Sequence, residues 1–332
     1  MSKQTIAIIG AGSFGTALCF LLGQNGNHIN LWCHSKNDAQ VINETGRNPK
    51  HFCSVDLQNT TAFDDLESCI ANTQACILAI PSFALSECTS SLKGKISDEL
   101  PIIILSKGLD PKTGLLLPQL AAKTLGNPSR IAALAGPNHA EELIKKAYAG
   151  AVAACESKSC ASYFQQLISN EFFRIYTSSD VIGVSLCAAS KNVIAIACGV
   201  ARGLGFGDNT TALLITRGIA EIRRLVLACG GKDQTCMGLA GIGDLNVTCC
   251  SSHSRNGSFG EKLASGANVD DYERQNHVVV EGAHNVDALL KLAASNNIEM
   301  PIMQTVKRLL DEQIDVNKAI ENLITRELKA EF

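Results

Sequence analysis

A glycine-rich turn near the start of the chain most restricts how it can fold. Residues 5–9 (TIAII) form a short β-rich run that predicts a strand, and the sequence GAGSFG follows directly at residues 10–15. A helical stretch over residues 16–25 comes next, and the apolar run at residues 28–32 predicts a second strand. After a right-handed crossover this strand lies parallel to the first. The sequence therefore predicts a complete strand–helix–strand unit by residue 33.

The spacing of these glycines predicts a dinucleotide-binding site. Gly10 allows the tight turn, Gly12 lets the backbone approach a pyrophosphate, and Gly15 lets helix and strand pack closely. Ser13 and Phe14 lie in the same turn, where the start of the helix offers free N–H groups and its positive dipole end to phosphates. A purely structural turn is the alternative. The preceding strand and the following helix favour cofactor binding.

The residues after the second predicted strand bear on the choice between NADH and NADPH. NAD-selective sites place an Asp or Glu there, about 20 residues after the glycines, to bind the ribose 2′-hydroxyl. This chain instead has Cys33-His34-Ser35-Lys36. His34 and Lys36 either accommodate a 2′-phosphate or are solvated loop residues. The sequence predicts that NADPH is used at least as well as NADH.

The chain changes character near residue 181. Strand-forming runs alternate with helical or irregular segments before this point, and long stretches of helix formers broken by glycines follow it. The length of 332 residues also favours two domains. We expect an α/β chain with a doubly wound, Rossmann-like NAD(P)-binding domain over residues 1–181 and an all-α substrate domain over residues 182–332. The other predicted strands cover residues 75–80, 101–105, 131–135, 151–154 and 173–176.

Charge and cysteine content argue against several classes of site. The net charge of −3 and the pI near 6.2 provide no overall basic field for nucleic acid. The apolar run ending at Ile9 is too short for a signal-peptide core or a membrane span, so we expect a cytoplasmic protein without an integral membrane segment. The fourteen cysteines contain no Cys-x-x-Cys pair. We therefore expect no metal site, and reduced core thiols are favoured over disulfides.

Ordered local patterns from residue 6 to about residue 301 resemble the bacterial type of the NAD(P)-dependent glycerol-3-phosphate dehydrogenase family. Beyond the glycine turn, the patterns include Ile80-Pro81-Ser82, Ser106-Lys107-Gly108, Ala135-Gly136-Pro137-Asn138, Lys191-Asn192-Val193, Gly241-Ile242-Gly243-Asp244, Ser254-Arg255-Asn256 and Val279-Val280-Glu281-Gly282. The resemblance implies a Rossmann-like domain followed by a helical domain. It also implies reduction of dihydroxyacetone phosphate to glycerol 3-phosphate, the backbone of glycerophospholipids, and by analogy a homodimer.

The resemblance implies a role for each residue that matches a family motif. Lys191 stands in an otherwise apolar helical stretch, where burial is costly without a partner. The matching family lysine is the general acid/base, and a surface lysine is the alternative. Asp244 would bind substrate hydroxyls and orient Lys191, or it caps a helix. The implied substrate-binding residues are Lys107, Gly136, Asn138, Lys191, Asp244, Ser254, Arg255 and Asn256. The implied cofactor-binding residues, besides the glycine turn, are His34, Lys107, Ala140, Arg255, Val279 and Glu281.

Two of these positions have their own alternatives. The forked guanidinium of Arg255, with hydrogen-bonding neighbours on both sides, suits the substrate phosphate, although an exposed arginine turn is the ordinary interpretation. Asn138 departs from the family, which usually has Ser or Thr after Gly-Pro. Because asparagine both donates and accepts hydrogen bonds, the contact can survive with altered geometry.

Two other functions compete with this interpretation. A 3-hydroxyacid dehydrogenase of the same architecture would share the glycine turn and a catalytic lysine, but it needs a carboxylate pocket instead of a phosphate pocket. A catalytically silent dinucleotide sensor needs the glycine turn but no proton donor. The presence of Lys107, Lys191, Asp244 and Arg255 together argues against a sensor.

Overall fold

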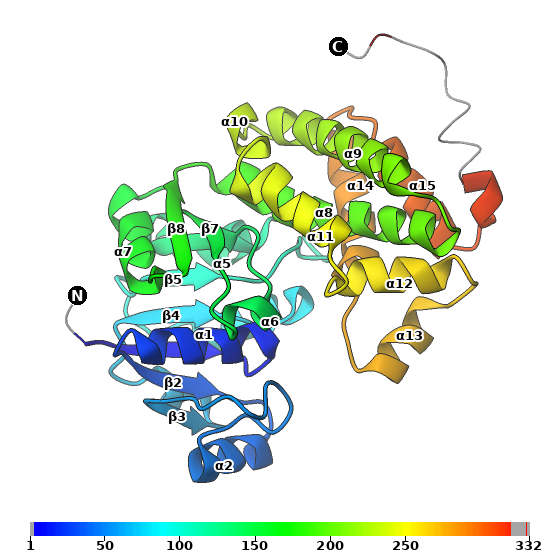
Figure 1. Cartoon of the computed structure of the whole chain (residues 1–332). Helices are drawn as coiled ribbons and strands as arrows, with labels where there is room; N and C mark the ends of the chain where they lie inside the picture. Colours follow the sequence, from blue (N-terminus) through cyan, green and yellow to red (C-terminus); the bar gives the residue numbers. More distant parts are fainter. Residues whose placement is uncertain (1–2, 320–329, 331–332) are drawn as a thin grey trace. The chain divides into compact units, whose positions relative to one another are not determined.

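The computed structural model describes residues 3–319 and residue 330, and the chain divides into two compact units at Ser185/Leu186 (Figure 1). The first unit contains an eight-stranded sheet in the order β3-β2-β1-β4-β5-β6-β7-β8. All neighbouring strands are parallel except β6 and β7, which are antiparallel. The strands are β1 (Thr5–Ile9), β2 (His28–Trp32), β3 (Thr60–Phe63), β4 (Ala75–Leu78), β5 (Ile102–Ile104), β6 (Ile131–Ala135), β7 (Ala149–Ala154) and β8 (Phe173–Ser178).

Helices cover both faces of this sheet, so its central strands are buried on both sides. In β1, Ile6 and Ile8 join one hydrophobic cluster, whereas Ala7 and Ile9 join another. Such strands appear in a sequence as unbroken apolar runs. The first cluster includes side chains of α1 (Ser13–Gln24), α2 (Lys36–Thr45), α6 (Ala140–Leu143) and α7 (Lys158–Ile168). The second includes side chains of α3 (Leu66–Ile70), α4 (Leu85–Leu92) and α5 (Leu117–Leu125).

The structure confirms the doubly wound fold class and corrects one strand. Every strand expected from the sequence is present, with ends that agree to within two residues, but β3 was not expected. Its sequence, TTAF, lacks an apolar run because the strand lies at the edge of the sheet. The side chain of Asn43 donates to the carbonyl of Ala62 at 2.9 Å and accepts from its amide at 2.8 Å. This amide side chain satisfies the edge in place of a further strand.

The second unit is helical, as expected. Its described part, residues 186–319, contains no strand. The chain enters it within α8 (Val181–Gly203), whose residues from Val184 to Ala201 are all buried. The α-helices that follow it as far as residue 310 are α9 (Asp208–Ala228), α10 (Asp233–Cys236), α11 (Asp244–Cys250), α12 (Arg255–Leu263), α13 (Val269–Asn276), α14 (Glu281–Ser295) and α15 (Pro301–Leu310).

The apolar helix α8 and most of the cysteines are buried in the interior of the protein. By length and composition α8 resembles a membrane span, but 89% of its most apolar window is buried inside the structure, as in the core helix of a soluble protein. The fourteen cysteines are free thiols, and ten of them are buried. Among the described residues, no cluster of three His, Cys, Asp or Glu side chains has a geometry that suits a metal ion.

Candidate active site

The glycine turn has the backbone that a phosphate-binding loop requires. Gly10 has a φ of +117°, and a side chain there would meet the carbonyl oxygen of Ala79 at 2.5 Å. Gly15 passes so close to the carbonyl of Gly10 that no side chain fits between them. At Gly12, by contrast, an added Cβ would find no atom within 4 Å. The turn is therefore closed toward the protein and open at its second glycine.

The start of α1 is available to an anion. Gly12 precedes the helix without a side-chain cap, so no side chain satisfies the first N–H groups, which belong to Ser13, Phe14 and Gly15. Free N–H groups at the positive end of a twelve-residue helix form a ready site for a pyrophosphate. The residues present therefore fit a dinucleotide cofactor at this turn.

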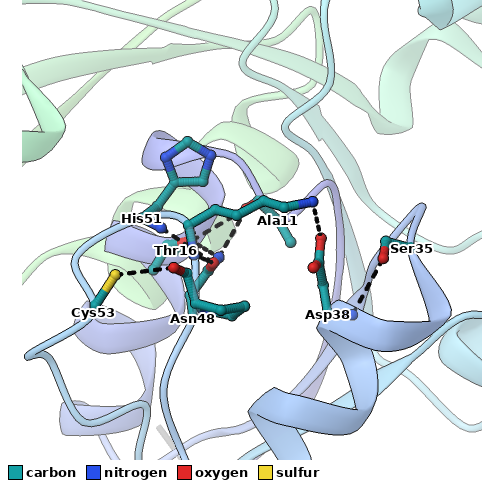
Figure 2. A network of polar contacts seen from close by, with 9 residues as sticks. Ala11, Thr16, Ser35, Asp38, Asn48, His51 and Cys53 are labelled. Carbon is teal, nitrogen blue, oxygen red and sulfur yellow. Dashed lines mark hydrogen bonds and ion pairs between the residues drawn. The ribbon is translucent and has the colours of Figure 1, made fainter. Parts of the chain in front are cut away.

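A loop between α2 and β3 fastens the glycine turn in place (Figure 2). The side chain of Asn48 is 2% exposed and donates to the carbonyl of Ala11 at 2.9 Å and to the hydroxyl of Thr16 at 2.8 Å. The ring of His51, on the same loop, lies 3.2 Å from the hydroxyl of Ser13. Neither Asn48 nor His51 was expected from the sequence, because a single asparagine or histidine in a loop gives no signal of the contact it makes.

The other first-unit candidates follow the carboxyl ends of parallel strands. His34 comes after β2, is exposed, and meets the ring of Trp32 edge-on with centroids 6.1 Å apart. Lys107 comes after β5 and is half-buried. After β6 lie Gly136, Asn138, which is 6% exposed, and Ala140, which begins α6. Because β1, β2, β5 and β6 run parallel, these residues occupy one edge of the sheet, where open α/β sheets bind their ligands.

In the second unit, the structure brings two predicted residues into direct contact. Lys191 is 4% exposed and Asp244 is 1% exposed, and the lysine Nζ lies 2.5 Å from Oδ1 of the aspartate. Nζ also donates to the hydroxyl of Thr248 at 2.8 Å. The surface-lysine alternative for Lys191 is therefore wrong, because the ammonium is buried and paired. Thr248 was not expected, although its place one helical turn after Asp244 gave a usable signal.

Asp244 reaches Lys191 because the chain before α11 is not regular helix. A π-helical segment, Leu239–Gly243, leads into α11 and is interrupted at Gly241, where φ is −93° and ψ is −105°. A side chain at Gly241 would collide with the carbonyl of Cys236, so only glycine permits this path. Asp244 is then the first residue of α11 and not its cap, which rules out the capping alternative.

The segment 254–256 also forms a helix start. Ser254 caps α12 by accepting from the amide of Gly257 at 3.1 Å, and Arg255 is the exposed first residue of that helix. Asn256 is 8% exposed and accepts from the amide of Gly282, near the start of α14, at 2.9 Å. An added Cβ at Gly282 would lie 2.6 Å from the carbonyl of Asn192, the neighbour of Lys191. Asn256 therefore ties the start of α14 to α12, and Gly282 lets this start lie against the part of α8 that carries Lys191.

Two further candidates lie at the start of α14. Val279 is partly buried and precedes the helix by two residues. Glu281 is the first residue of α14, and its carboxylate accepts from the side chain of Asn285 at 3.2 Å.

Comparison with known proteins identifies the family. The family models described as NAD-dependent glycerol-3-phosphate dehydrogenase N-terminus and C-terminus match residues 5–161 and 180–321. The chain belongs to this family. A glycerol-3-phosphate dehydrogenase [NAD(P)+] of Clostridium botulinum (strain Eklund 17B / Type B) is 41% identical over 100% of both chains, and one of Legionella pneumophila (strain Corby) is 37% identical over 100% of both.

The architecture agrees with that of a solved glycerol-3-phosphate dehydrogenase. The crystal structure of the enzyme from Coxiella burnetii has a TM-score of 0.93 and 34% identity to this chain, and the match covers 98% of this chain and 99% of that one. The resemblance inferred from the sequence motifs is therefore confirmed. Membership in this glycerol-3-phosphate dehydrogenase family also supports the use of NADH or NADPH as the cofactor.

Proposed function

We propose that this chain reduces dihydroxyacetone phosphate to sn-glycerol 3-phosphate with NADPH or NADH, reversibly, and that Lys191 is the proton donor. The reaction is that of its family and supplies the backbone of glycerophospholipids. The observation that carries the catalytic assignment is the buried contact of Lys191 with Asp244 and Thr248. A buried ion pair contributes little net free energy of folding. Stability therefore does not explain why this pair is buried, and a role in catalysis does.

Lys191 suits the task of a general acid. Asp244 and Thr248 accept hydrogen bonds from its Nζ, so they fix the position of the ammonium. The bound nicotinamide supplies the hydride to C2 of the substrate. Lys191 then donates a proton to the C2 oxygen, and its charge stabilises the developing alkoxide until the proton arrives. The neutral amine that remains takes up a proton from solvent before the next turnover.

The remaining residues position the two ligands. Arg255 begins α12 behind the cap Ser254, so a guanidinium and a helix N-terminus act on the same anion, and we assign them to the substrate phosphate. Asn256 joins the start of α14 to α12 and contributes to the same group. By the family motifs, the other proposed substrate residues are Lys107, Gly136, Asn138 and Asp244. The proposed cofactor residues are Gly10, Gly12, Ser13, Phe14, Gly15, His34, Lys107, Ala140, Arg255, Val279 and Glu281.

We also propose the setting in which the enzyme works. Residues 1–181 would form the NAD(P)-binding domain and residues 182–332 the helical catalytic domain. A cytoplasmic location is consistent with the dehydrogenase fold and with an apolar α8 that is a buried helix. A homodimer is proposed by analogy with the family.

The experiment that tests the function follows the absorbance of the reduced nicotinamide, which falls when a ketone is reduced and rises when a hydroxyacid is oxidised, with three kinds of substrate. Dihydroxyacetone phosphate should support rapid oxidation of NADPH or NADH, whereas dihydroxyacetone, which lacks the phosphate, should support little. Oxidation of 3-hydroxyacids by NADP+ or NAD+ should be undetectable. Turnover of the hydroxyacids but not of the phosphorylated ketone would contradict the proposal. Tight cofactor binding without any turnover would indicate a sensor.

A further inference from the structure

The carboxyl ends of β1 and β2 emerge side by side. Ile9 is paired with Trp32 in the parallel register, so the glycine turn and residues 33–35 leave the sheet at neighbouring positions. In dinucleotide-binding folds, the adenosine ribose lies between these two segments and its 2′-substituent is read by side chains after the second strand. No acidic side chain stands directly after β2, where the chain has Cys33-His34-Ser35-Lys36. A carboxylate for the 2′-hydroxyl of NADH must therefore come from elsewhere in the chain.

The loop after α2 supplies a cation at this place. Asn48 anchors the loop to the carbonyl of Ala11 in the glycine turn, and its Oδ1 accepts from the backbone amides of Lys50 at 2.9 Å and His51 at 3.2 Å. These bonds hold the backbone of Lys50 close to the turn. From there the side chain of Lys50 crosses to the first turn of α2, where Nζ lies 2.6 Å from Oδ2 of Asp38.

The helix after β2 supplies the carboxylate. Asp38 lies in the first turn of α2, and its amide donates to the hydroxyl of the cap Ser35 at 3.2 Å (Figure 2). Its side chain is 16% exposed, whereas that of Lys50 is 62% exposed. Burial raises the pKa of the Cys33 thiol to about 11, with Asp38 adding to the increase and Lys50 opposing it. The charges of Asp38 and Lys50 therefore both act on Cys33, the first residue after β2. The adenosine ribose is expected at this place.

We propose that Lys50 and Asp38 determine the cofactor preference of this enzyme at the adenosine ribose. Lys50 leaves Asp38 to pair with the 2′-phosphate of NADPH, and Asp38 accepts a hydrogen bond from the 2′-hydroxyl of NADH. The same ion pair thus serves either cofactor. In the NADPH complex the 2′-phosphate replaces Asp38 as the partner of Lys50, and in the NADH complex the 2′-hydroxyl bonds to Asp38. Besides the buried thiol of Cys33, the titratable groups on the segment after β2 are His34 and Lys36, and Lys36 adds positive charge for the phosphate. This inference rests on the proposed use of NAD(P)H.

The test compares Lys50→Met and Asp38→Asn with the wild type. The measured quantity is the ratio of kcat/KM with NADPH to kcat/KM with NADH, at saturating dihydroxyacetone phosphate. Lys50→Met should lower this ratio by about tenfold, since a charge-assisted contact to the phosphate is lost while solvent screens part of its strength. Asp38→Asn should raise the ratio, because the phosphate loses a repelling neighbour and the 2′-hydroxyl loses an acceptor. Dissociation constants of both cofactors, from nucleotide fluorescence, should change in the same directions.

Two control variants make the result specific. Lys95 and Glu67 form another exposed ion pair of the first unit, with an N–O distance of 2.6 Å and side chains 44% and 63% exposed. Lys95→Met removes the same charge there and should leave the ratio unchanged. Lys50→Arg keeps the charge and should keep the preference.

The outcomes separate this inference from the proposed function. A fall of about fivefold or more in Lys50→Met alone among the lysine variants supports it, since loss of a specific phosphate contact is expected to cost about this much or more. A smaller fall, or an equal fall in Lys95→Met, overturns it. Wild-type protein that neither binds nor oxidises NADPH or NADH would overturn the proposed function itself.

Discussion

Removal of one partner of the buried pair Lys191–Asp244 should lower the free energy of unfolding by more than the intact pair contributes to it. Their side chains are 5% and 2% exposed, so solvent cannot reach a charge that loses its partner. In Lys191→Met the carboxylate of Asp244 loses the ammonium at 2.5 Å, and in Asp244→Leu the ammonium keeps the hydroxyl of Thr248 at 2.8 Å. Each single variant should lose about 3 kcal/mol, the cost of leaving a buried charge uncompensated.

The double variant Lys191→Met/Asp244→Leu should lose no more than either single variant, because the second substitution removes the charge that the first one left alone. The coupling free energy in the cycle is then about 3 kcal/mol. Urea unfolding monitored by far-UV circular dichroism measures it. Each single variant should also lower the melting temperature by about 6 to 12 °C for a unit of this size.

The unfolding experiment has an internal reference. Trp32, the only tryptophan, lies in β2 of the first unit, so its fluorescence reports unfolding there. Single variants that each cost less than about 1 kcal/mol, or a double variant whose cost equals the sum of both, would refute the reasoning about a buried, coupled pair.

Three further predictions concern the glycine turn, the phosphate site and the thiols. Gly12→Ala should not change the melting temperature, because its Cβ meets no atom within 4 Å, but it should weaken NADPH binding by about tenfold or more. Gly10→Ala should lower the melting temperature, because Gly10 has a φ of +117°. Normal NADPH binding by Gly12→Ala would exclude the pyrophosphate from this turn. Arg255→Ala should raise KM for dihydroxyacetone phosphate about 30-fold, or about 2 kcal/mol, whereas Arg274→Ala, which removes another exposed arginine, should not. An unchanged KM in Arg255→Ala would contradict its role. A thiol reagent at about pH 8 should react first with the exposed Cys53 and Cys250, because burial raises the pKa of Cys88 to about 12 and most other thiols are buried. Rapid reaction of all fourteen thiols in the native protein would be inconsistent with this structure.

The sequence predicted those parts of the fold in which local pattern and burial agree. β1 and β4 lie in the middle of the sheet and are buried on both faces, so each appears as an apolar run. β3 does not, because an edge strand such as TTAF packs only partly, and the bonds from Asn43 that complete it join residues 19 positions apart.

The residues of the candidate site that belong to family motifs could be predicted from the sequence. Those that join the site only through tertiary contacts could not. Lys191 and Asp244 were both named from the motifs, and their contact follows from α8 and α11 packing in the same unit. Asn48 looks like any loop asparagine until its bonds to the glycine turn are seen. Asp38 was overlooked because the carboxylate was sought directly after β2, whereas it lies in the first turn of α2.

The most direct test of the catalytic assignment is the turnover number of Lys191→Met with NADPH and dihydroxyacetone phosphate, measured at a temperature where circular dichroism shows the variant to be folded. Lys291→Met, on the exposed surface of α14, is the matched control. The expected result is a kcat lowered by at least about 100-fold, as for loss of a general acid, with NADPH still bound by the variant and a kcat near that of the wild type in the control. A folded Lys191→Met protein whose kcat stays within about tenfold of the wild type would contradict the role of Lys191 as the proton donor.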